Sequence, residues 1–71
     1  MDWIYERGLS CSDVASLIES WIFSQRDRRI LYRRFIDGVH IEELAAEFDL
    51  SVSQTKRIIS KGKAILVSQC W

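Results

Sequence analysis

A short run near the C-terminus gathers the side chains best suited to binding an anionic partner. Residues 51–63 carry four cations, no acid, and several hydroxyl and amide side chains. In a DNA groove, short polar side chains read base edges, and cationic ones bind the flanking phosphates. The residues concerned are Ser53, Gln54, Lys56, Arg57 and, one turn further on, Lys61. A merely solvated, charged surface is the alternative interpretation of the same cations.

Few residues are of a kind that performs catalysis or binds a metal. His40 has no nucleophile beside it in the sequence, and with Cys11 and Cys70 it supplies three possible metal ligands at no recognisable spacing. The sequence shows no recognisable acid–base pair, nucleophile set or phosphate-binding loop. We therefore expect no enzyme, no cofactor and no metal. We expect His40 to lie at the start of a helix, within reach of a phosphate.

The net charge is zero, but the charges are segregated along the chain. Residues 1–23 carry one basic and four acidic side chains, and residues 24–40 carry five arginines against two aspartates. Residues 41–50 carry four acids and no Lys or Arg, whereas residues 51–71 carry four bases and no acid. Such segregation indicates a basic face for an anionic partner and an acidic face for a cationic one. The alternative is that the acids simply screen the bases.

Four segments place apolar residues at the spacing of amphipathic helices. In the first, Val14, Leu17, Ile18, Trp21 and Ile22 lie at positions i, i+3, i+4, i+7 and i+8. We expect the arginines of the second segment to be solvated. The expected helices span residues 13–23, 25–36, 41–48 and 52–66 or a little beyond.

Particular residues mark where these helices end and how they pack. Gly38 ends the second helix in the left-handed conformation, and Asp49 tolerates that conformation in the turn after the third. Gly62 lies on the apolar face of the fourth helix, where a glycine costs about 1 kcal/mol relative to alanine, so we expect a neighbouring helix to approach closely there. Hydroxyl side chains precede the helices and are the expected N-caps, namely Ser10 or Ser12, Ser24, and Ser51 or Ser53.

Length and composition favour one all-α domain. The 71 residues include no proline and three glycines, which favours helices joined by short turns. We expect a small bundle of four to five helices that contains a helix-turn-helix. The domain would span residues 1–71, with an N-terminal helical extension over 1–24, the helix-turn-helix unit over 25–66 and a tail over 67–71.

Neither a membrane span nor a secretory signal is recognisable in the sequence. No stretch approaches the roughly 18 consecutive apolar residues that a span needs, and the N-terminus lacks a basic start followed by an apolar run. We expect a cytoplasmic protein that does not enter a membrane. Its two cysteines, Cys11 and Cys70, would then be reduced and at least partly buried.

Several short motifs in the second half of the chain are familiar, namely residues 26–31 (RDRRIL), 34–35 (RF), 38–45 (GVHIEELA) and 50–58 (LSVSQTKRI), together with Lys61. Through these motifs, residues 25–66 resemble region four of the housekeeping-type bacterial sigma factors and the small sigma-like helix-turn-helix proteins of bacteria and prophages. The resemblance covers 42 of the 71 residues.

The resemblance implies that the chain binds double-stranded DNA, with the second helix of the helix-turn-helix in the major groove of a promoter-type element. By position, it implies that Val52, Ser53 and Arg57 face the bases. The positions that it places along the DNA backbone are Arg26, Arg34, His40, Ile41, Gln54, Lys56 and Lys61.

Three positions depart from the pattern of the family. Position 52 is usually basic and here is Val52, position 53 is usually acidic and here is Ser53, and Asp49 replaces the turn glycine. The preferred DNA sequence therefore does not carry over, and Val52 is suited to contact a thymine methyl group. We also expect that the chain is not a complete sigma factor, because it has no room for the regions that bind core polymerase tightly and melt DNA.

The leading hypothesis is a sequence-specific DNA-binding transcription regulator. The alternative is a protein-interaction module that docks to RNA polymerase or another transcription factor without stable DNA binding of its own. The acidic residues 42–49 favour that alternative, and so do Trp3, Trp21 and Trp71, since aromatic residues are enriched at interfaces. Trp21 also falls on an apolar stripe, which predicts that it belongs to the core.

A homodimer through residues 1–23 is a further prediction. A single helix-turn-helix offers a small footprint on DNA, and dimers commonly read two half-sites.

Overall fold

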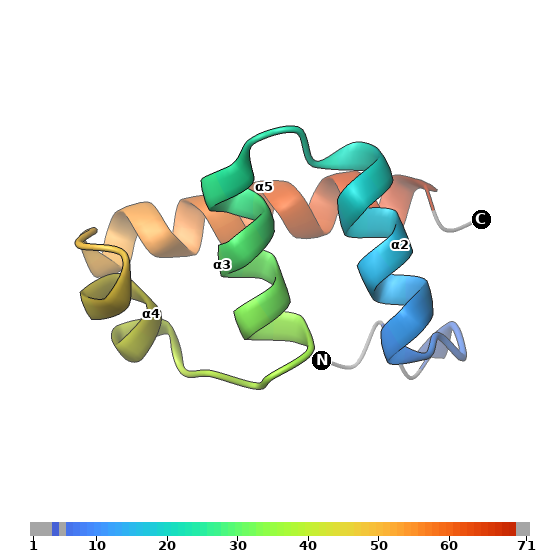
Figure 1. Cartoon of the computed structure of the whole chain (residues 1–71), viewed down its shortest axis with the longest axis horizontal. Helices are drawn as coiled ribbons and strands as arrows, with labels where there is room; N and C mark the ends of the chain where they lie inside the picture. Colours follow the sequence, from blue (N-terminus) through green and yellow to red (C-terminus); the bar gives the residue numbers. More distant parts are fainter. Residues whose placement is uncertain (1–3, 5, 70–71) are drawn as a thin grey trace.

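The computed structural model describes residue 4 and residues 6–69. Trp3, Cys70 and Trp71 lie outside the described residues. The helices whose bounds it defines are α2 (Cys11–Trp21), α3 (Gln25–Phe35), α4 (Ile41–Glu47) and α5 (Val52–Gln69). The predicted small all-α bundle with a helix-turn-helix is thereby confirmed. The helix α5 runs behind α2 and α3, and α4 lies at the end where α5 begins (Figure 1).

Hydroxyl side chains cap the helices, as the sequence predicts. Ser10 begins α2 in a reciprocal capping box, in which its hydroxyl accepts from the Asp13 backbone N–H (3.2 Å) and the Asp13 carboxylate accepts from the Ser10 N–H (3.0 Å). Ser24 caps α3 by accepting from the Asp27 N–H. Ser51 caps α5 by accepting from the Gln54 N–H. Of the two candidates at each of these helices, the N-cap is therefore Ser10 rather than Ser12 for α2, and Ser51 rather than Ser53 for α5.

Left-handed residues end α3 and α4. Asp49 follows α4 with φ 56°, and Gly38 follows α3 with φ 72°. After α4, the N–H of Asp49 donates to the Ala46 carbonyl and that of Leu50 to the Ala45 carbonyl, at 3.3 Å and 2.8 Å. These two bonds are the Schellman pattern, which satisfies the last carbonyls of a helix and turns the chain sharply. The turn aims α5 away from α4.

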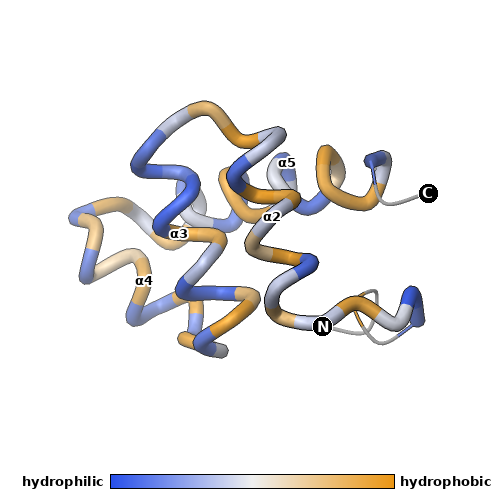
Figure 2. The backbone as a smooth tube through the Cα atoms, turned by 45° about the vertical axis from the view of Figure 1, so that its right-hand side comes forward, coloured by the Kyte–Doolittle hydropathy of each residue, from blue (hydrophilic) through white to orange (hydrophobic). Residues whose placement is uncertain are grey.

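Buried side chains from all four helices form one apolar cluster. Each helix alternates between hydrophobic and hydrophilic residues along its length, as expected when one of its faces is buried (Figure 2). Because α2 contributes to this cluster, it packs into the same core as the helix-turn-helix. The members are Val14, Ile18, Ile22, Ile30, Leu31, Leu44, Ile59 and Leu66.

Gly62 lies where α5 passes closest to α3. It is buried, and a Cβ atom there would stand 2.6 Å and 2.8 Å from the two δ-methyl carbons of Leu31. Leu31 is itself fully buried, and its side chain would have to shift to admit that atom. The close approach predicted at Gly62 is therefore confirmed, and the absence of a side chain allows α3 to rest on α5.

Polar contacts tie α2 to α3. The Arg28 guanidinium donates to the carbonyls of Glu19 and Ile22, which lie at the C-terminal end of α2. The Tyr32 hydroxyl donates to the Glu19 carboxylate (3.0 Å) and the Ala15 carbonyl (3.4 Å). Partial burial, and next the hydrogen bond to Glu19, raise the pKa of Tyr32 above its ordinary value. The N-terminal helix is thus held by directed bonds as well as by apolar packing.

Two expectations about buried side chains are wrong. Trp21 was expected in the core but is 42% exposed at the last residue of α2, whereas Ile22, which lies on the same apolar stripe, is buried. Cys11 was expected to be at least partly buried but is exposed in the first turn of α2, where it is a free cysteine.

Among residue 4 and residues 6–69, no helix combines the length and apolarity needed to cross a membrane.

Candidate nucleic-acid interface

The start of α5 is held in place by local hydrogen bonds and by one buried threonine. Thr55 has no exposed surface, and its hydroxyl donates to the Ser51 carbonyl (3.0 Å). Ser51 accepts from the Gln54 N–H (3.1 Å), and the Gln54 side-chain carbonyl accepts in return from the Ser51 N–H (3.1 Å). This is a capping box with glutamine as its partner. The first turn of α5 is therefore ordered before any ligand arrives.

The outer face of α5 presents the residues that the resemblance assigns to bases. At about 100° per residue, Ser53, Arg57 and Ser60 lie opposite the buried face of the helix. All three side chains are exposed, and Val52 beside them is 39% exposed. Ser53 and Arg57 thus share the outer face of α5, whereas Val52 is exposed at its first residue, about 100° around the helix from Ser53.

The cations of α5 remain available for a ligand. Lys56 lies on one side of the outer face and Lys61 on the other, and both are exposed. Within the described part of the chain, Lys56, Arg57 and Lys61 make no ion pair or side-chain hydrogen bond. This face therefore presents positive charge that the described residues leave uncompensated.

Gln54 differs from these cations because its side chain already has a structural role. Its carbonyl oxygen is used by Ser51 in the capping box, which leaves the amide NH₂ group as the part that can donate outward. This role of Gln54 is not among the predictions made above, although a serine followed three residues later by glutamine is the signature of a capping box.

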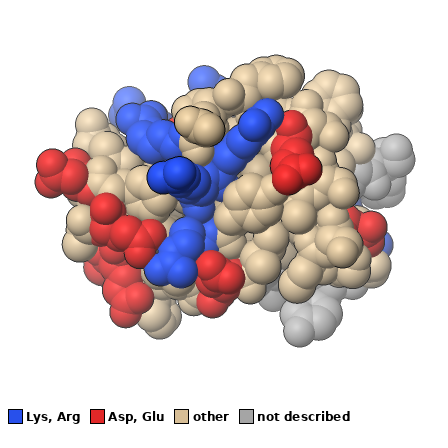
Figure 3. Space-filling view, in the orientation of Figure 1, with Lys and Arg blue, Asp and Glu red and all other residues tan. Residues whose placement is uncertain are grey.

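Three of the five arginines of α3 donate to acceptors in neighbouring segments, so the expectation of solvated arginines holds only in part. Arg28, Arg33 and Arg34 are partly buried and donate to acceptors of the protein itself. Arg26 is exposed and contacts Asp27 (3.3 Å), and Arg29 is exposed without an ion pair among the described residues. Figure 3 shows Lys and Arg as a band across the middle of the molecule. Much of the positive charge of α3 is therefore already paired with acceptors in the protein.

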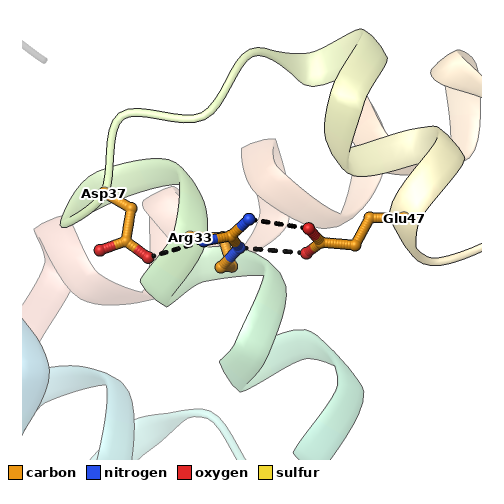
Figure 4. A network of polar contacts seen from close by, with 3 residues as sticks. All are labelled: Arg33, Asp37 and Glu47. Carbon is orange, nitrogen blue, oxygen red and sulfur yellow. Dashed lines mark hydrogen bonds and ion pairs between the residues drawn. The ribbon is translucent and has the colours of Figure 1, made fainter.

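Arg33 joins the end of α3 to the end of α4 (Figure 4). Its guanidinium donates to both carboxylate oxygens of Glu47, at 3.1 Å and 2.7 Å, and to Asp37 at 3.2 Å. These hydrogen bonds raise the pKa of Arg33 and lower the pKa of Glu47 relative to their ordinary values. Glu47 is the last residue of α4, so the contact orients the helix that braces α5.

Three further positions assigned to the DNA backbone surround the loop from α3 to α4. Arg34 donates to the Val39 carbonyl (3.0 Å), which holds that loop closed. His40 is exposed at the N-cap of α4, without a side-chain capping bond. Ile41 is partly buried and packs against the core, so its backbone N–H is the part that faces outward from the helix end.

The face of α4 that points to solvent is acidic. Glu42 and Glu43 are exposed in its first turn, and Figure 3 shows acidic residues gathered on the side of the molecule where α4 lies. Acidic side chains near a helix N-terminus stabilise the helix through its dipole. Among the described residues, no group of three or more His, Cys, Asp or Glu side chains is arranged to hold a metal ion.

The family model for sigma-70, region 4 matches residues 23–64, which are 42 of the 71 residues. The chain belongs to the sigma-70 region 4 family. Domains of this family are DNA-binding helix-turn-helix modules of transcription proteins, and they bind both DNA and RNA polymerase. Comparisons with curated proteins and with solved structures gave no match.

The match to the sigma-70 region 4 family begins in the loop between α2 and α3. The whole of α2 therefore precedes the matched residues, although its side chains complete the core beneath α3 and α5. The matched part contains the whole of α3 and α4 and the first two-thirds of α5, including every position assigned above to DNA.

Proposed function

We propose that this sigma-70 region 4 protein is a sequence-specific transcription regulator that places the start of α5 in the major groove of DNA. The observation that carries the proposal is the outer face of α5, where exposed cations that have no partner among residues 4 and 6–69 flank short polar side chains. Membership of a DNA-binding family supports it. Cations that the protein does not neutralise release counterions when they meet phosphates, which drives binding.

In this proposal Val52, Ser53 and Arg57 read bases. Arg57 has the length and the donor geometry to recognise guanine. The Ser53 hydroxyl can form a hydrogen bond with more than one type of base, and the Val52 side chain suits contact with a thymine methyl group. The proposal rests on their exposure at the N-terminal end of α5, which is the end of a recognition helix that meets base edges.

The remaining positions contact the DNA backbone in this proposal. Lys56, Lys61 and Arg26 act as cations. Gln54 acts through its amide NH₂ group and Ile41 through its backbone N–H. His40 also contacts the backbone in this proposal. Arg34 does so through the guanidinium N–H groups that do not donate to the Val39 carbonyl.

The decisive test is a salt series of binding to a random-sequence duplex pool, followed by selection of the bound sequences. Each phosphate contact contributes about −0.9 to the slope of log affinity against log salt. We expect Lys56→Gln and Lys61→Gln each to reduce the slope by about that amount, whereas Val52→Ala and Ser53→Ala change the selected motif. Lys63→Gln is the matched control, because Lys63 is an exposed cation of the same helix without an assigned contact. Absence of binding at low salt would overturn the proposal.

A second candidate function is docking to RNA polymerase or another transcription factor. It is favoured by the exposed acidic side chains of α4, such as Glu42 and Glu43, and by the polymerase binding of the family. Glu42→Gln with Glu43→Gln should weaken co-sedimentation with polymerase while DNA binding is kept. Retention of polymerase by that double variant would argue against α4 as the docking face.

Two structural proposals complete this picture. Residues 1–71 act as one domain in which residues 1–24 support the helix-turn-helix, as the packing of α2 into the shared core suggests. The protein also forms a homodimer through residues 1–23, which would let two copies read two half-sites.

A further inference from the structure

The corner between α2 and α3 exposes two large aromatic side chains. Phe23 is 81% exposed and Trp21 is 42% exposed, the two highest values among the large hydrophobic residues described. Ile22 between them has extended backbone angles and is buried. In extended chain, successive side chains point to opposite sides, so the burial of Ile22 turns Phe23 out into solvent. The Phe23 ring adds little to the core, and its apolar surface is open to a partner.

This corner borders the DNA-facing side of α5. Phe23 lines the same pocket as Lys61 and Ile65 of α5. Four residues along a helix amount to about 40° of rotation, so Lys61 stands about 40° from Arg57 and Ile65 a further 40° in the same direction. Arg57 is on the outer face, and Ile65 is already beside the corner. The corner therefore lies along the edge of the outer face that Lys61 occupies.

The same edge carries cations that the proposed function assigns to DNA phosphates. Lys61 is exposed and makes no ion pair or side-chain hydrogen bond among the residues that the structure describes. Arg26 is exposed three residues after Phe23, and its contact with Asp27 is a surface pair that holds it weakly. A DNA strand alternates anionic phosphates with sugars whose faces are largely apolar. Cations beside an exposed ring match that alternation.

We propose that the corner extends the DNA interface, with the Phe23 ring and the exposed part of Trp21 packing against the sugars of the strand whose phosphates Lys61 and Arg26 bind. The inference rests on the proposed function and adds an apolar contact to a surface that is otherwise polar and cationic. Sugar and phosphate contacts fix the position of a protein on DNA without reading its sequence. Phe23 thus contributes affinity rather than sequence preference. The proposed homodimer then pairs through residues that precede Trp21.

Binding of Phe23→Ser to the duplex selected by the wild type tests the contact. We expect about tenfold weaker binding, which corresponds to losing the burial of about half of a phenylalanine side chain. The slope of log affinity against log salt should stay that of the wild type, because the substitution removes no charge. The selected motif should also stay the same. Phe23→Leu is the matched control, since it keeps an apolar side chain and should keep most of the affinity.

A series of shortened duplexes locates the contact. Base pairs are removed one at a time from each end of the selected site. Loss of the sugars that Phe23 contacts should weaken wild-type binding about tenfold and leave Phe23→Ser unaffected, so that the two proteins bind equally below one length. Because Phe23 is so exposed, Phe23→Ser should keep the helical circular dichroism and the thermal midpoint of the wild type. Weaker binding is then not a consequence of unfolding.

The possible outcomes separate this inference from the function on which it rests. Wild-type binding that Phe23→Ser does not weaken would overturn the inference and leave the DNA-reading proposal standing. A wild-type chain that binds no duplex at low salt would overturn both. Dimerisation without DNA that depends on Phe23, measured by sedimentation equilibrium, together with unchanged DNA affinity in Phe23→Ser, would assign the corner to a second copy and overturn the inference as well.

Discussion

The helices α3 and α5 are both rich in cations, yet they use them in opposite ways. On α3, Arg28 and Arg33 point their guanidinium groups at carbonyls or carboxylates of neighbouring helices. On α5, Lys56, Arg57 and Lys61 are exposed and have no such partner among the described residues. The first set holds the fold together, and the second set is left for a ligand.

The difference shows that counting charges along a sequence does not give the charge that a partner meets. Residues 24–40 and residues 51–71 have similar net positive charge in the sequence. Arginine has several donors in a planar fork and suits carbonyl and carboxylate partners inside a protein, whereas lysine is a compact, strongly hydrated charge. The basic surface of α3 is accordingly smaller than its composition indicates.

The largest expected effect comes from removing the available cations of α5. The triple variant Lys56→Gln, Arg57→Gln, Lys61→Gln should lose about 10²- to 10³-fold in DNA affinity at moderate salt. Its thermal unfolding should stay close to that of the wild type, because substitutions at exposed sites usually change stability by less than about 0.5 kcal/mol. Anisotropy titration and a thermal melt measure the two quantities. A large fall in stability would show that α5, like α3, uses its cations internally.

The opposite result is expected on α3. Arg28→Ala removes charged donors from two carbonyls at the end of α2 and should lower the free energy of unfolding by about 1–2 kcal/mol. Arg29→Ala, at the exposed neighbour, is the control and should change it by less than about 0.5 kcal/mol. Urea denaturation followed by circular dichroism compares them. Equal effects of the two substitutions would contradict the assignment of Arg28 to the fold.

The contact that sets the spacing between α3 and α5 should be sensitive to one methyl group. Gly62→Ala forces its Cβ against Leu31 and should cost about 1–2 kcal/mol of stability, even though alanine is the better helix former. In a Leu31→Val background, which shortens the opposing side chain, the cost should shrink or reverse. A double-mutant cycle measures this coupling. Additive effects of the two substitutions would mean that the helices do not meet at this point.

The smallest effect concerns the Arg33–Glu47 pair, whose side chains are 42% and 41% exposed. Because the pKa of Glu47 is lowered in the folded state, its contribution to stability is present above its ordinary pKa of about 4.3 and is lost as the pH falls through the lowered value. Glu47→Gln should therefore flatten part of the loss of thermal stability in acid. Thermal melts at a series of acid pH values measure this, and an unchanged acid profile in the Glu47→Gln variant would contradict the stabilising role of the pair.

Much of the fold was predictable because local signals and the core agree. The spacing of Val14 and Ile18, the hydroxyls of Ser24 and Ser51, and Gly38 and Asp49 at the turns act over a few residues, so a sequence displays them directly. The assignment of Val52, Ser53 and Arg57 to DNA came from the resemblance and stays a prediction. Their common exposure at the start of α5 is what the structure adds.

Local patterns and one motif were enough to predict the helices α2 to α5 to within a few residues of their ends, the close approach at Gly62 and the family, since each depends on neighbours along the chain or on a motif. Packing between distant segments determines which arginines have protein acceptors, that only Ile22 of the pair Trp21 and Ile22 is buried, and that Phe23 lies beside a pocket. Those outcomes depend on which groups from distant segments meet. The residues around an arginine in the sequence do not show whether a carbonyl or carboxylate of another helix lies within hydrogen-bond distance of its guanidinium group.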